Sequence, residues 1–144
     1  MATPEQNIET VKRFFNAAST ANFDDFDNYM VEKFVTHGDA LFPFFMGREG
    51  MKGGVGFFKK AFPDATLHLE EIFAEGNKVV AHVRVTGHQE KEWLGVPPPE
   101  DGRAYTWTAS TIIRFGDDGQ MEERWVIEDE LGMMIQLGIM PPLH

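Results

Sequence analysis

The sequence predicts an α+β fold, because two hydrophobic periods follow one another along the chain. Over residues 4–62 the apolar side chains recur at the three- and four-residue spacing of amphipathic helices. From Ala65 onward they alternate with polar side chains, as in strands with one buried face. Helices followed by a meander of strands favour helices packed on one face of an antiparallel sheet.

The first helix has the clearest start signal. Thr3 is a favourable N-cap, Pro4 suits the first helical position, and Gln6 stands where a capping box needs it. We therefore expect a helix over residues 4–20.

Two further helices are expected before the strands. Asn22 is predicted to cap a short second helix. An extended piece over residues 34–37 should follow this helix. A third helix is expected over residues 48–62, although its glycines weaken it, and Pro63 ends it.

Four strands with alternating patterns should follow. They begin at Ala65 and continue over residues 78–89, 105–115 and 120–129. The connection over residues 91–103 contains three consecutive prolines and is not expected to pair in the sheet. A short final helix should follow the last strand.

Composition limits the classes of function. The 144 residues suit one domain spanning 1–144, and a hydrophobic fraction of 42% argues against disorder. A net charge of −10 opposes binding to nucleic acid or to an anionic membrane. The absence of cysteine, of a signal peptide and of a membrane-spanning run leads us to expect a cytoplasmic protein.

An ordered set of short segments resembles the SnoaL-like polyketide cyclases (ester cyclases) of the NTF2-like superfamily. The most informative segment runs from Asp118 to Gly138 and reads as a turn, a strand with Glu-x-Trp-x-x-x-Asp, and a helix ending in Gln-Leu-Gly. The other segments are Phe34-Val35-Thr36-His37-Gly38, Gly47-Arg48-Glu49-Gly50, Phe62-Pro63-Asp64, Glu75-Gly76-Asn77-Lys78-Val79-Val80, Val85-Thr86-Gly87-His88, Leu94-Gly95-Val96-Pro97-Pro98 and Arg114-Phe115. The resemblance implies a cone-shaped α+β barrel, in which a curved antiparallel sheet wraps around the N-terminal helices. It also implies a deep hydrophobic pocket and a homodimer or higher homo-oligomer.

The resemblance further implies where the catalytic groups of a cyclase would stand. Such enzymes close a ring by an intramolecular aldol step, with an Asp as general acid and base and a His and an Asn assisting. In this sequence the Asp position falls on Val126, the His position on Thr111 and the Asn position on Thr36. The resemblance therefore predicts the fold of this chain but not its catalytic residues. We expect these three residues only to contact the substrate.

Three other residues are candidates for proton transfer. His37, followed by Asp39, stands near the expected pocket mouth, where it would be a base, a metal ligand or a hydrogen-bonded loop residue. His88 ends the second strand, where it would face the pocket or solvent. Asp129 precedes the last helix, so it would be catalytic or an N-cap.

Three larger side chains are candidates for substrate binding. Arg124 shares a strand face with Val126 and would bind a carboxylate or enolate oxygen, or form a surface salt bridge. Trp107 would stack on a flat ligand or simply pack in the core. Trp93 lies in the connection over residues 91–103, which is either a lid or a surface loop.

Two functions stay open on this evidence. The first is a cofactor-free enzyme of the isomerase, cyclase or lyase class, acting by proton transfer on a small hydrophobic, oxygenated molecule. The alternative is a non-catalytic protein that binds a small apolar ligand, which Val126 favours. We expect neither a metal site nor a cofactor.

Overall fold

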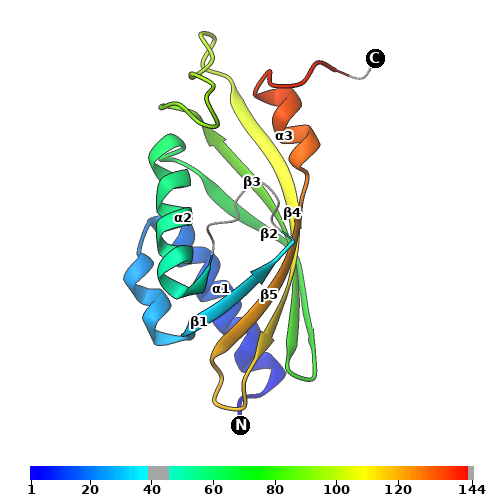
Figure 1. The fold of residues 1–144 in the computed structure, drawn as a ribbon. Coiled ribbons are helices and arrows are strands. Elements are labelled where there is room, and N and C mark those ends of the chain that lie inside the picture. The colour runs from blue at the N-terminus through cyan, green and yellow to red at the C-terminus, as the bar shows by residue number, and fades with distance from the viewer. Residues whose placement is uncertain (39–45, 143–144) are drawn as a thin grey trace.

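The computed structural model describes residues 1–38 and 46–142, which form an α+β structure with a five-stranded mixed sheet in the order β1-β5-β4-β3-β2. Helices α1 and α2 lie on one side of the sheet, and α3 lies at the end of the molecule opposite the N-terminus (Figure 1). The described helices are α1 (Pro4–Thr20), the 3₁₀ helix η1 (Phe23–Asn28), α2 (Gly47–Ala61) and α3 (Glu130–Gln136). The described strands are β1 (Met30–His37), β2 (Thr66–Glu75), β3 (Lys78–His88), β4 (Ala104–Phe115) and β5 (Met121–Glu128).

Helix α1 begins as its sequence predicts. The hydroxyl of Thr3 accepts a hydrogen bond from the backbone N–H of Gln6 at 3.1 Å, and the Gln6 side chain accepts one from the N–H of Thr3 at 2.8 Å. The second predicted helix is the 3₁₀ helix η1, and Asn22 precedes it without a side-chain capping bond. The capping box therefore fixes the start of α1, whereas η1 depends on packing of its buried Phe26.

The meander from β2 to β5 is antiparallel, as predicted, but β1 differs. It pairs in parallel with β5, where His37 lies opposite Trp125 and Thr36 opposite Arg124. The sequence predicts an antiparallel sheet and a short extended piece over residues 34–37, so it predicts neither the full length nor the parallel pairing of this edge strand. Its partner lies far along the chain, so no local pattern reveals the pairing or its direction.

The faces of β3 and β4 follow the period-two pattern, whereas a register shift between Leu69 and Glu71 interrupts it in β2. In β4, Tyr105, Trp107, Ala109, Thr111 and Ile113 are buried and their alternate neighbours are mostly exposed. The buried face of the sheet meets α1 and α2 in one hydrophobic cluster. A second cluster joins the end of α2 to β4 and α3. A cavity lies between these two clusters. None of the helices in residues 1–38 and 46–142 is long and apolar enough to cross a membrane.

Candidate functional site

A cavity of about 110 Å³ lies between the helices and the buried face of the sheet. Every layer of the fold contributes to its wall, so the cavity depends on the whole chain and not on one loop. The lining residues are Phe14, Phe15, Ala18, Met51, Val55, Phe58, Leu67, Val85, Trp93, Trp107, Arg124, Glu128 and Met133.

Aromatic side chains form much of this wall. Trp107 on β4 is 5% exposed and meets the edge of the Phe58 ring from α2, with ring centroids 5.7 Å apart and planes at 76°. Phe14 and Phe15 of α1 also line the cavity. Such a surface favours flat apolar ligands, because aromatic rings gain both buried area and edge or face contacts.

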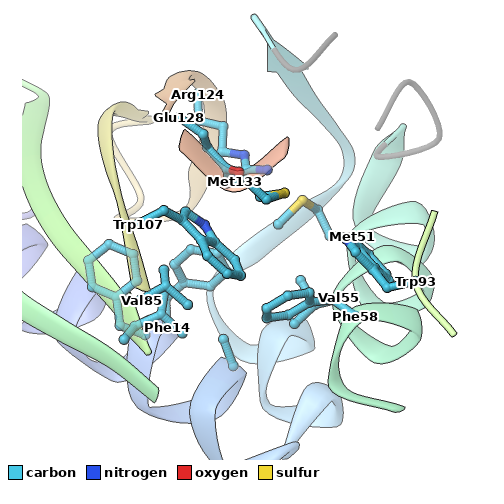
Figure 2. Close-up of a pocket in the computed structure, with 13 residues that line it drawn as sticks. Phe14, Met51, Val55, Phe58, Val85, Trp93, Trp107, Arg124, Glu128 and Met133 are labelled. Carbon is cyan, nitrogen blue, oxygen red and sulfur yellow. The ribbon is translucent and has the colours of Figure 1, made fainter. Parts of the chain in front are cut away.

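Two charged residues stand among the described lining residues, and both come from β5. Figure 2 shows Arg124 and Glu128 together at one end of the cavity, near Met133. The Nε of Arg124 donates a hydrogen bond to the hydroxyl of Thr36 on β1 at 3.1 Å. An otherwise apolar cavity with charged groups at one end is the usual composition of a small-molecule site.

The three positions at which the resemblance places catalytic residues lie close to this end of the cavity. Val126 is 4% exposed and pairs with Thr111 across β4 and β5, but neither is among the lining residues. The hydroxyl of Thr111 donates to the carbonyl of Trp125 at 3.0 Å. Gly38 has φ +90°, and a Cβ there would collide with the carbonyl oxygen of Val126, so β1 lies very close to β5 at this point. Thr36 is connected to the cavity by its hydrogen bond with Arg124.

His37 lies on the other face of the sheet. Its ring stacks on Trp125 at 5.3 Å, and its Nε2 lies 2.6 Å from a carboxylate oxygen of Glu123. Hydrogen bonds from His37 and then from Arg114 hold the pKa of the Glu123 carboxyl below its usual value. The structure thus gives His37 a partner on the surface, and a catalytic role for it stays a prediction. Asp39 lies outside the described residues.

His88 and Asp129 are also outside the cavity lining. The Nδ1 of His88 lies 2.6 Å from Asp64, whose other oxygen accepts the backbone N–H of His88 at 2.8 Å. Partial burial acts to raise the pKa of Asp64, but these hydrogen bonds outweigh it and leave the pKa lowered. Asp129 caps α3 by accepting the N–H of Gly132 at 2.9 Å. Both residues therefore have structural partners, and their catalytic roles stay predictions.

Of the two charged lining residues, the sequence predicted Arg124 as a site residue but not Glu128. It shares one face of β5 with Arg124 and Val126, so the alternation of the strand was the available signal. In the described part of the chain, no three His, Asp or Glu side chains converge as metal ligands would.

Comparison with known proteins identifies the fold. The sequence profile of the SnoaL-like polyketide cyclases matches residues 9–137. The chain belongs to this family. No curated protein matches it.

Solved structures agree with this membership. IdmH from Streptomyces antibioticus, described as a candidate polyketide cyclase, is 30% identical, with a TM-score of 0.77 over 92% of this chain and 99% of its own. A candidate SnoaL-like polyketide cyclase from Jannaschia sp. CCS1 is 28% identical, with a TM-score of 0.79 over 98% and 99%. AclR from Streptomyces galilaeus, described as a candidate hydroxylase, is 21% identical and has a TM-score of 0.84 over 99% and 87%, which shows the shared fold. This member of the family thus has the fold of small-molecule enzymes.

Proposed function

We propose that this protein is a cofactor-free enzyme that transfers a proton within a flat, hydrophobic, oxygenated substrate held in the cavity. The observation that carries the proposal is the placement of Arg124 and Glu128 at one end of an otherwise apolar, aromatic cavity. The reaction class is that of a cyclase, isomerase or lyase, as membership of the family favours.

The pair supplies the two functions that such chemistry needs. Removal of a proton next to a carbonyl leaves negative charge on the carbonyl oxygen, so the site must hold both a base and a positive group. In our proposal the carboxylate of Glu128 accepts the proton and the guanidinium of Arg124 stabilises the enolate oxygen. The enolate carbon then attacks a second carbonyl of the substrate, and Glu128 returns the proton to the new alkoxide.

The position of Glu128 on β5 supports this assignment. The resemblance places the acid of the cyclases on Val126, and Glu128 lies two residues further along the same strand face. A shift of one residue would turn a side chain to the opposite face, whereas a shift of two keeps it on the cavity side. A longer side chain at a displaced position can therefore replace the missing Asp.

The test compares Glu128→Gln with Asp129→Asn. The first variant removes the proposed base and keeps the size of the side chain. The second removes the neighbouring carboxylate and keeps a capping group of equal quality for α3. On a polyketide ester with an acidic methylene and an intramolecular carbonyl, Glu128→Gln should lower kcat by about a hundredfold or more. Asp129→Asn should turn the substrate over like the wild type.

The results separate the open hypotheses. If Asp129→Asn loses activity and Glu128→Gln stays active, Asp129 and not Glu128 is the catalytic base. His37→Gln and His88→Gln, measured in the same way, test the two histidines. Tight ligand binding without turnover over a broad panel of such esters would favour the non-catalytic binding protein, which the buried Val126 at the acid position also favours.

A further inference from the structure

The connection after β3 forms a tight and well-anchored turn, here called the Trp93 loop and comprising residues 89–96. Trp93 and Val96 exchange two backbone hydrogen bonds, of 3.0 and 2.9 Å. Leu94 and Gly95 between them both have positive φ, of 53° and 79°, as a type I′ turn requires. Leu94 is a poor residue for this backbone conformation, so the surrounding contacts must hold the turn in place.

Gln89 supplies the main contact from within the loop. Its side chain is nearly buried, at 6% exposure, and its Nε2 donates to the carbonyls of Lys91 at 3.0 Å and Val96 at 2.7 Å. Both protons of the amide group are therefore used to join the two ends of the turn. The backbone N–H of Glu90 donates to the carbonyl of Ala61 at 2.7 Å, which ties the loop to the end of α2.

The turn places Trp93 in the wall of the cavity. The indole is 1% exposed and packs against Phe58 of α2 and against Phe62, which directly follows α2, with ring centroids 5.3 and 5.9 Å apart and planes at 73° and 82°. It also lines the cavity together with Phe58 (Figure 2). A large ring fixed in this way gives the cavity a rigid limit, because a packed aromatic cluster has little room to move.

We infer that Trp93 sets the upper size of the ligand and that Gln89 is a positioning residue that holds Trp93 in place. The inference rests on the proposed function, since it takes the cavity to be the substrate site. The inference also assigns substrate specificity: the Trp93 loop, and not the charged end of the cavity at Arg124, determines how many fused rings the cavity accepts.

The test uses three aromatic acids with the same carboxylate and increasing ring number: benzoate, 2-naphthoate and anthracene-2-carboxylate. Their dissociation constants are measured by titration calorimetry on the folded protein. Trp93→Ala should improve the affinity for the anthracene acid relative to benzoate by about tenfold, because the removed indole opens space for a ring. Gln89→Leu should shift this ratio in the same direction by a smaller factor.

The matched control is Trp125→Ala, which removes an indole from the outer face of the sheet, where Trp125 is 37% exposed. It should leave the ratio unchanged. Trp93→Phe, which disturbs the packing less, repeats the test with a smaller expected shift and covers the case in which Trp93→Ala does not fold.

Failure of the inference can be told from failure of the proposed function. If the wild type binds none of the three acids, the proposed site is wrong. If it binds them, loses them in Arg124→Met, and keeps the same ratio in Trp93→Ala, Trp93→Phe and Gln89→Leu, the site stands and the role of the Trp93 loop is refuted.

Discussion

Replacing Val126 by Asp introduces the acid that the resemblance to the cyclases places at this position, and the structure predicts a large loss of stability. Val126 is 4% exposed and is not part of the cavity wall. Loss of the buried isopropyl group costs about 1.5 kcal/mol. Burial of an unpaired polar group adds about 1–3 kcal/mol. With the introduced carboxyl neutral, the free energy of unfolding of the variant should therefore be about 2.5–4.5 kcal/mol lower than that of the wild type.

Ionisation of the introduced carboxyl makes the loss depend on pH. An unpaired carboxyl in an apolar site has a raised pKa in the folded state, so the unfolded chain loses its proton first. Stability is then highest below the unfolded value of about 3.9 and falls by about 1.4 kcal/mol per pH unit until the folded-state pKa is reached.

Urea unfolding of Val126→Asp and Val126→Asn between pH 4 and pH 8 measures this effect, since the two variants differ in the ionisable group. The gap between them should widen as the pH rises. If the two are equally stable at pH 8, the introduced carboxylate is solvated. The cavity would then reach Val126, and our description of its wall would be wrong.

Three more predictions concern ligand binding, stability and pH. Trp107→Ala should weaken the binding of 2-naphthoate, measured by calorimetry, by about tenfold. Unchanged affinity would show that Trp107 does not contact the ligand. The Nζ of Lys59 donates to three backbone carbonyls, at 2.8, 2.8 and 3.0 Å. Lys59→Met should therefore lower the free energy of unfolding by about 2–3 kcal/mol. The control is Lys60→Met at an exposed position, and equal losses in the two variants would show that the hydrogen bonds of Lys59 do not stabilise the fold. Because the pKa of Asp64 is lowered, its contribution should be present above about pH 4 and disappear as the pH falls further. Asp64→Asn should thus differ from the wild type in thermal unfolding at pH 7 but not at pH 2, and a difference that persists at pH 2 would contradict the charge-based account.

The helices and the meander were predictable because their signals are local. Thr3 and Gln6 form the expected capping box, and the alternation in β4 predicts which of its side chains are buried. The glycine-rich stretch also forms a helix, α2, although its residues have a low intrinsic preference for one. The tertiary contacts of Met51 and Ala61, both buried, offset that preference.

The site was harder to predict because it depends on contacts between distant segments. His37 ends a strand whose partner and direction only the folded chain shows, and pairing with Trp125 places it on the outer face. Glu128 could be predicted from the sequence, since the alternation of β5 places it on the same face as Arg124 and Val126. The contacts of Gln89 in the Trp93 loop could not be predicted from the sequence, because they are made to two backbone carbonyls whose positions depend on the fold of the loop.

The most direct test of the central claim is a crystal structure of the protein with 2-naphthoate bound. Our account predicts that the carboxylate lies against Arg124, that the rings lie beside Trp107 and Phe58, and that Glu128 faces the ligand. A naphthoate bound instead on the outer face, beside His37 and Trp125, with the cavity closed, would contradict it.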